Sequence, residues 1–200
     1  MSIEVRIDHT GSARDTVAAV HDIVSGPRGR SLMAVLGKTH ERTLQDHFAG
    51  LEQQPNKRGW QKQHFWAQIR RATSFVSASQ RAATVAVSDP RLATHIHGAT
   101  IRPRRSKYLA IPMRPEAYGI RPSSGLIADL FVIRSRKNKL YLARTEGNAL
   151  RAYYRLLRSV TIPAKPDALP PEPVSIAAIT DAADAYISRA ARRAANQRAN

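Results

Sequence analysis

The sequence predicts an α+β fold, in which N-terminal helices pack on a small antiparallel sheet and a proline-rich linker leads to a C-terminal helix. Three observations support this fold class. Apolar residues recur at helical spacing through much of residues 13–77. Short extended runs separated by Pro, Gly and basic turns fill the middle of the chain. Five prolines then fall within residues 163–173, and an Ala-rich amphipathic stretch follows them.

The N-terminal segment is expected to hold one strand and one helix. Residues Ile3–Ile7 alternate apolar and charged side chains, which is the pattern of a strand with one buried face. Ser12 then precedes a helical stretch over residues 13–24, and Gly26-Pro27 ends it.

Two further helices are predicted in the first half of the chain. The first runs from Gly29 to Gln53 and carries one apolar stripe, which Gly37 interrupts. The second runs from Gln63 to Ser77 after a turn cluster at residues 55–60. Its expected buried side consists of Phe65, Trp66, Ile69 and Phe75.

The middle of the chain is expected to form a small antiparallel sheet with basic turns. Two extended runs that end in Pro are predicted to be edge strands joined by residues 104–107, because Pro cannot donate to a strand ladder. A second hairpin is predicted around residues 136–138. The elements are a strand at Ala83–Val87, a short helix at Pro90–Ile96, extended runs at Thr100–Pro103 and Tyr108–Pro112, and the hairpin strands Leu130–Arg134 and Lys139–Ala143.

The last third of the chain is expected to leave the core. A strand is predicted at Tyr153–Ile162, which would close a core domain of residues 1–162. Residues 163–173 form a stiff proline-rich linker, and residues 174–200 form the C-terminal helix. A solitary amphipathic helix needs a surface that covers its apolar stripe, so the stripe gives the candidate subunit-interface residues Ile176, Ile179, Tyr186 and Ile187.

The charge is strongly positive and unevenly distributed. The chain carries 32 Lys and Arg against 15 Asp and Glu, which gives a formal net charge of +17. Between Gln53 and Pro115, twelve basic residues accompany a single acid, Asp89. Such a field favours a polyanion or an acidic protein surface as partner. The alternative is a soluble protein that is Arg-rich because its genome is GC-rich, so the charge predicts a class of partner and not a function.

Basic and aromatic residues are interleaved in residues 56–71. This combination is typical of a surface on which the bases of a single strand stack. In the alternative interpretation, the aromatic residues are helix core and the cations form a solvated face. The residues concerned are Lys57, Arg58, Lys62, Arg70 and Arg71, with Trp60, Phe65 and Trp66.

No pattern in the sequence indicates catalysis, and we expect neither an enzyme nor a cofactor. His95-Ile96-His97 would point two imidazoles the same way on a strand, but no Asp, Glu or Cys lies near enough to complete a zinc site. The chain has no cysteine, which excludes disulfides. Neither a signal peptide nor an apolar run of about 18 residues is present, which predicts a cytoplasm-like compartment and no membrane partner.

Three short stretches carry a resemblance to a known family. One is residues 55–66, where Pro-Asn-Lys-Arg-Gly-Trp leads into His-Phe-Trp. Another is residues 97–103 with 107–112 and 116–119, which contains Gly-Ala-Thr-Ile-Arg-Pro and Lys-Tyr-Leu-Ala-Ile-Pro. The third is residues 160–166, Val-Thr-Ile-Pro-Ala-Lys-Pro. Between Arg42 and Pro166 the chain resembles the virion-morphogenesis and tail-completion proteins of Mu-like and related tailed phages. It departs from them at Lys165, where they have Arg, and at the insert of residues 167–173.

The resemblance implies a structural subunit that completes the tail or joins it to the head. Its expected partners are copies of itself in a ring, which we expect to be a hexamer, and other neck and tail proteins. Its expected location is the virion, with the host cytoplasm as the place of assembly. A non-specific nucleic-acid-binding protein is the alternative function.

A ring around a DNA channel would use basic loops for non-specific contact with packaged DNA. The candidate nucleic-acid or channel-facing residues are Arg102, Arg104, Arg105, Lys107, Arg136 and Lys137. A solvated hairpin tip, or a contact with an acidic neighbour, is the alternative role of these loops.

Overall fold

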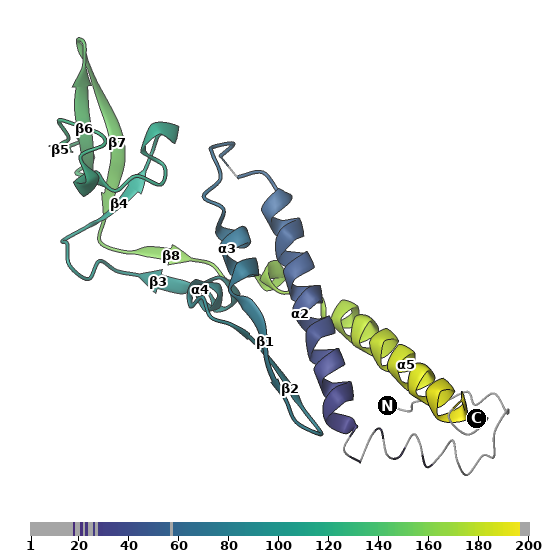
Figure 1. Cartoon of the computed structure of the whole chain (residues 1–200). Coiled ribbons are helices and arrows are strands. Elements are labelled where there is room, and N and C mark those ends of the chain that lie inside the picture. The colour runs from purple at the N-terminus through teal and green to yellow at the C-terminus, as the bar shows by residue number, and fades with distance from the viewer. Residues whose placement is uncertain are drawn as a thin grey trace. The chain divides into compact units, whose positions relative to one another are not determined.

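The computed structural model describes residues 18, 21, 23, 26, 28–56 and 58–196, and it combines helices with antiparallel sheets, as predicted (Figure 1). The predicted strand at Ile3–Ile7 and most of the predicted helix over residues 13–24 lie outside the described residues. The chain divides into two compact units. One holds residues up to 49, residues 69–88 and residues from 169 onward, and the other holds residues 50–68 and 89–168.

Helix α2 (Gly29–Gln53) has the bounds that the sequence predicts. Its apolar stripe supplies four buried side chains, Leu32, Leu44, Phe48 and Leu51. Gly37 interrupts the stripe because a side chain has no room there. A Cβ at this position would stand 2.7 Å from the Phe75 ring and 2.9 Å from the Cβ of Ala83. The hairpin that carries these two residues therefore packs directly on the helix backbone at Gly37.

Replacing Gly37 by alanine is expected to lower the free energy of unfolding by about 1–3 kcal/mol, because the added methyl group overpacks the contact with Phe75. Gly50 provides the control, since it lies in the same helix and a Cβ there would meet nothing within 4 Å. Gly50→Ala is expected to stabilise the protein by about 0.5–1 kcal/mol through helix propensity alone. Urea unfolding measures both variants, and equal stabilisation by the two would contradict the close approach at Gly37.

The helix predicted at Gln63–Ser77 is wrong in its second half. Helix α3 (Phe65–Arg71) is short, and strand β1 (Thr73–Ala78) follows it and pairs with β2 (Ala83–Val87), whose bounds were predicted. Phe75 lies opposite Val85 in this hairpin rather than on a helix face. The β-branched and aromatic side chains of residues 73–76 favour extension, and the partner strand supplies the hydrogen bonds that a longer helix would have made internally.

The second unit contains a four-stranded antiparallel sheet with the order β4-β7-β6-β5 (Figure 1). The predicted hairpin is confirmed as β5 (Phe131–Arg134) and β6 (Leu140–Glu146). Strand β4 (Leu109–Pro112) lies at an edge, as its terminal proline predicts. Strand β7 (Ala149–Leu157) lies between β4 and β6.

A register shift in the pairing of β6 with β7 builds the core of this unit. Leu142 pairs with Tyr154 and Ala143 pairs with Ala152, so Tyr153 is the extra residue of a bulge. The bulge allows two consecutive tyrosines to be buried, Tyr153 at 5% exposure and Tyr154 at 1%. The Tyr154 hydroxyl donates to the carbonyl oxygen of Ile120 at 3.0 Å, which satisfies its polar end.

The two proline-ended runs, which were predicted to be edge strands joined by residues 104–107, lie in different sheets. Strand β3 (Ala99–Ile101) pairs with β8 (Val160–Ile162), whereas β4 pairs with β7. Residues 102–108 therefore connect two sheets and are not a hairpin tip. The strand predicted at Tyr153–Ile162 is two strands for the same reason, because the chain leaves one sheet after Leu157 and joins the other at Val160.

The predicted short helix is confirmed as α4 (Arg91–His97), and Gly98 ends it. Gly98 has φ 69° and ψ 163°, a conformation that only glycine adopts readily. A Cβ on Gly98 would stand 2.8 Å from the Ala164 nitrogen and 2.9 Å from the Ile162 oxygen. The backbone that leaves β8 thus passes directly over this glycine.

The chain after β8 contains a short 3₁₀ turn, Pro166–Ala168, within the predicted linker. Helix α5 follows as Glu172–Asn196, so it begins two residues before the predicted start at Val174. Pro173 is tolerated there, because the first turn of a helix does not need its backbone N–H.

Candidate functional site

The basic segment, residues 102–107, joins β3 to β4 and carries four exposed cations, Arg102, Arg104, Arg105 and Lys107. Its Ser106 hydroxyl donates to the Tyr108 carbonyl oxygen at 2.8 Å. The Lys107 ammonium stands 5.9 Å from the centre of the Tyr108 ring. Within the part of the chain that the structure describes, none of the four forms an ion pair with a carboxylate. The segment therefore presents concentrated positive charge to its surroundings.

The other two candidate cations, Arg136 and Lys137, are exposed in the turn between β5 and β6. The turn is ordered by polar contacts on either side of them. Arg134 donates to the Asn138 side-chain oxygen at 2.6 Å, and the backbone N–H of Lys139 donates to the Ser135 hydroxyl at 3.2 Å. These bonds hold the turn while they leave both cations exposed.

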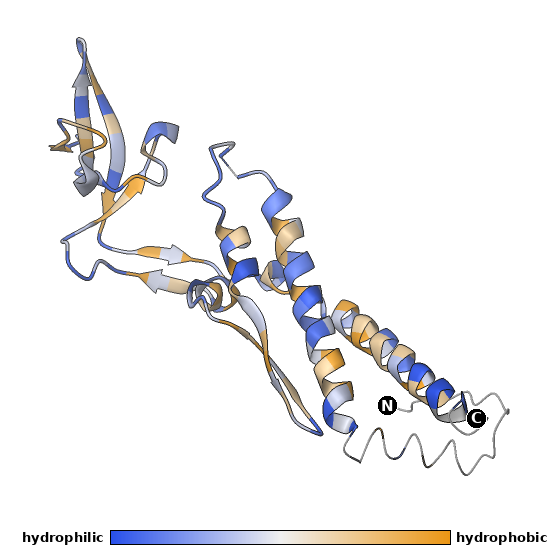
Figure 2. Ribbon diagram, in the orientation of Figure 1, coloured by the Kyte–Doolittle hydropathy of each residue, from blue (hydrophilic) through white to orange (hydrophobic). Residues whose placement is uncertain are grey.

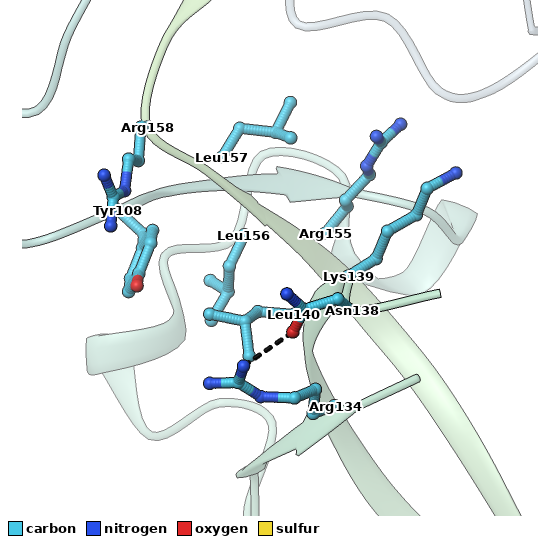
Figure 3. Close-up of a pocket in the computed structure, with 9 residues that line it drawn as sticks. All are labelled: Tyr108, Arg134, Asn138, Lys139, Leu140, Arg155, Leu156, Leu157 and Arg158. Atoms are coloured by element: carbon cyan, nitrogen blue, oxygen red, sulfur yellow. Dashed lines mark hydrogen bonds between the residues drawn. The ribbon is translucent and has the colours of Figure 1, made fainter. Parts of the chain in front are cut away.

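A pocket of about 320 Å³ lies at the end of the sheet where β5 ends and β6 begins (Figure 3). Three strands and their flanking residues contribute to it. The lining residues are Tyr108, Arg134, Asn138, Lys139, Leu140, Arg155, Leu156, Leu157 and Arg158. Four of the nine are basic and none is acidic. Neither Arg136 nor Lys137 lines the pocket, although both lie in the turn between two residues that do.

Strand register assigns the pocket cations to two faces of the sheet. Leu140 lies opposite both Arg134 and Leu156, so these three residues share one face. Arg155 lies opposite Tyr141 and therefore belongs to the other face. Figure 3 agrees, since Lys139 and Arg155 extend away from Arg134 and Leu156. The Arg155 Nε is buried and has no hydrogen-bond partner among the described residues, which is unusual for a charged donor.

The three aromatic side chains of residues 56–71 contact other rings of the protein. Phe65 lies 4.8 Å from Trp66 and 4.5 Å from His95, measured between ring centres. Trp60 packs edge-on against Tyr118 at 5.4 Å. All three rings are half-buried, and Trp60 lies outside a helix, so these contacts describe neither a fully buried helix core nor a free stacking surface.

Cations stand over all three of these rings. The Arg58 guanidinium lies 4.7 Å from the centre of the Trp60 ring. The Arg91 guanidinium stands 5.3 Å from the Phe65 ring, and the Lys165 ammonium stands 5.0 Å from the Trp66 ring. Burial first, and then the charges of Lys165 and Arg91, lower the pKa of His95 below its ordinary value of 6.5. His95 and His97 lie on a helix rather than a strand, so two residues apart they do not face the same side.

Stability is expected to fall as the pH drops below about 6.5, in part because of His95. Above that pH His95 is neutral in both states and contributes no pH dependence. Below it, the unfolded chain takes up a proton that folded His95 accepts only at lower pH, which favours unfolding. His95→Gln is expected to reduce the slope of the free energy of unfolding against pH below about 6.5. The control is His97→Gln, an exposed position in the same helix. Urea unfolding at pH 7.5 to 5 measures the slopes, and an unchanged slope in the His95 variant would contradict the assignment.

A carboxylate network fixes the other end of the β6–β7 hairpin. The Tyr153 hydroxyl donates to the Glu146 carboxylate, which also pairs with Arg144 at 2.8 Å and Arg151 at 3.1 Å. The hydrogen bond from Tyr153, followed by the nearby arginines, lowers the pKa of Glu146. Glu146 therefore acts as a structural counter-ion, unlike a general acid, which requires a raised pKa.

The candidate interface residues lie on α5, and no described side chain of this helix is fully buried. Ile176 is 44% exposed and its neighbour Val174 is 52% exposed, while Ile179, Tyr186 and Ile187 are half-buried. Figure 2 shows hydrophobic residues interleaved with hydrophilic ones along the helix. By contrast, α2 has the same length and supplies four buried apolar side chains.

Among the described residues, no three His, Asp or Glu side chains gather closely enough to hold a metal ion. No described helix combines the length and apolar character that a bilayer crossing requires. Comparison of the chain with protein-family models, with curated proteins and with solved structures finds no match.

Proposed function

We propose that this chain is a structural subunit of a tailed-phage particle that assembles as a ring and completes the tail or joins it to the head. The observation that carries the proposal is the apolar stripe of α5, which has no fully buried side chain in the described part of the helix. The motif resemblance between Arg42 and Pro166 points in the same direction.

Helix α5 lacks a complete core of its own. A helix of 25 residues is stabilised mainly by packing of its apolar face, and α5 packs that face only in part. Contact with a neighbouring copy would complete the burial. In a ring the same contact repeats around a closed symmetry, so a modest free energy per interface is enough to hold the assembly.

Charging the exposed start of the stripe is expected to abolish self-association. Val174→Glu with Ile176→Glu places two carboxylates where we expect the neighbour to dock, and both positions are exposed enough for the fold to tolerate the change. Thr180→Glu with Ser188→Glu is the matched control, because it changes the charge equally at exposed polar positions of the same helix. Light scattering after size-exclusion chromatography should show oligomers for the wild type and the control and monomers for the stripe variant. A wild-type chain that stays monomeric would contradict the proposal.

Particles assembled without this protein would distinguish the two structural roles. Filled heads beside finished but unattached tails in electron micrographs would support head–tail joining. Tails of uncontrolled length would support termination of the tail tube. Absence of the protein from mature particles would contradict both roles.

The second candidate is a non-specific nucleic-acid-binding protein, and the observation that favours it is the exposed charge of the basic segment, which pairs with no carboxylate among the described residues. Neutralising phosphates releases condensed counterions, which needs positive charge but no base contact. A salt titration of duplex binding separates the candidates. Sub-micromolar, steeply salt-dependent binding by a monomer would favour this function over the structural one.

A further inference from the structure

We propose that the pocket at the end of the sheet β4-β7-β6-β5 is a phosphate-binding site whose ligand is a phosphate group of a nucleic-acid strand. The inference is independent of the assembly role, because it rests on the pocket and its charges alone. Binding in this pocket also differs from diffuse attraction to the basic segment, because the pocket is concave and offers specific hydrogen-bond donors.

The lining of the pocket carries uncompensated positive charge. Arg134, Lys139, Arg155 and Arg158 line the pocket, and no acidic side chain joins them. In the described part of the chain none of these four pairs with a carboxylate. Lys139 and Arg155 extend from the other face of the sheet than Arg134, but all four cations border the same end of it. Like charges gathered at one end of a sheet repel each other unless an anion lies beside them. Elsewhere in the chain, arginines close to a carboxylate form ion pairs with it. Arg144 and Arg151, for example, both pair with Glu146.

The pocket lining also supplies hydrogen-bond donors. Arginine presents a planar fork that matches two phosphate oxygens, and three of the four cations are arginines. The Arg134 side chain is held by its bond to Asn138, so little freedom is lost when it binds an anion. On the other face of the sheet, the buried Nε of Arg155 also lacks an acceptor among the described residues. Donors are thus present in excess at this end of the sheet.

The size and the lining of the pocket indicate the kind of ligand that it could hold. Its volume of about 320 Å³ is roughly ten times the share of one water molecule in the liquid and falls within the range of ligand pockets. Leu140, Leu156 and Leu157 supply an apolar part of the wall. The pocket therefore suits a phosphate group with an attached residue, such as one unit of a strand, rather than a lone ion.

Cations beyond the pocket indicate the source of the phosphate. Positive charge continues along the chain on both sides of the lining residues. Lys107 of the basic segment directly precedes Tyr108, and Arg136 with Lys137 lies between Arg134 and Asn138. A strand with one phosphate in the pocket has further phosphates that these exposed cations would attract, whereas a small phosphorylated molecule has none.

The test uses the full chain and two probes, inorganic phosphate and a short fluorescent single-stranded oligonucleotide. Arg134→Gln and Arg158→Gln each remove one pocket cation, and Arg121→Gln removes one exposed cation outside the pocket. Each pocket variant is expected to weaken oligonucleotide binding about tenfold, whereas the control changes it by about twofold or less. Phosphate is expected to raise the Tm of the wild type and the control above their values in chloride at equal ionic strength, and to raise it less in the pocket variants.

Unchanged Tm values in chloride would show that the pocket variants fold, and Arg158→Lys tests whether charge alone suffices. Equal losses in pocket and control variants would overturn the site in favour of a diffuse field. Stabilisation by phosphate with no competition from the oligonucleotide would overturn the assignment to nucleic acid and point to a small phosphorylated ligand. Repeating the titration on the Val174→Glu, Ile176→Glu variant separates the outcome from that of assembly, because the pocket should bind equally well in a monomer.

Discussion

Gly98→Ala is expected to lower the free energy of unfolding by about 3–5 kcal/mol, a large share of the stability of a typical domain. Two costs combine. The backbone at φ 69° and ψ 163° lies in a region that disfavours any side chain by about 1–3 kcal/mol. The new methyl group would also meet the Ala164 nitrogen and the Ile162 oxygen, at 2.8 Å and 2.9 Å. Because these are backbone atoms, they cannot rotate away as a side chain would.

Gly125→Ala is the matched control for the Gly98 variant. Gly125 has φ 74° and ψ −5°, and a Cβ there would meet nothing within 4 Å. Its substitution carries only the cost of a left-handed residue, about 1–2 kcal/mol. Urea unfolding compares the two variants. If Gly98→Ala cost no more than Gly125→Ala, the crossing of the chain over Gly98 after β8 would be disproved.

Local patterns predicted the elements that depend on local forces. The bounds of α2 follow from one apolar stripe, and the β5–β6 hairpin follows from two extended runs around a short turn. The errors arose where tertiary structure decided the outcome. Residues 73–78 leave a helical pattern because β2 pairs with them. Likewise, β3 finds its partner about sixty residues later, where Ala99 lies opposite Ile162, and no local signal indicates that pairing.

The candidate site illustrates the same limit. The exposed cations of the basic segment could be named from the sequence, because their density is visible there. The pocket could not, since Arg155 and Arg158 reach the same end of the sheet as Arg134 and Lys139 only through the register that places Leu140 opposite both Arg134 and Leu156. The available signal was the four basic residues Arg134, Arg136, Lys137 and Lys139, which lie in and beside the predicted turn at residues 136–138. Recognising these basic residues as one side of a pocket required knowing which strand lies beside β6.

Two surfaces of different chemistry therefore carry the functional interpretation. The stripe of α5 is apolar and half-covered, which is typical of an interface awaiting a partner. The sheet end and the basic segment are cationic and unpaired in the described residues, which is typical of an anion-binding surface. A ring subunit beside packaged nucleic acid would use both surfaces. A protein that only binds nucleic acid would need the second alone, so the two functions separate experimentally.

Replacing Arg102, Arg104 and Arg105 together by glutamine is expected to weaken duplex DNA binding by two to three orders of magnitude near 0.1 M salt. If each of these exposed cations neutralises one phosphate, the slope of log affinity against log salt should decrease by about 0.9 per contact, or about 2.7 in total. The loss should be nearly independent of base sequence, because phosphate contacts carry no sequence information. Fluorescence anisotropy with two unrelated duplexes over a range of salt measures both quantities.

The matched control is Arg189→Gln, Arg192→Gln and Arg193→Gln in α5, which removes the same charge from another exposed basic cluster. It lowers the formal net charge from +17 to +14, as the test variant does. If the basic segment binds phosphates directly, the loss of duplex affinity should be far larger in the test variant than in the control. Similar losses in both would mean that the overall positive field attracts the duplex and that residues 102–105 have no special role. Because both variants keep the apolar stripe of α5, self-association should survive in each, and the contribution of the basic segment can be measured without disturbing the assembly.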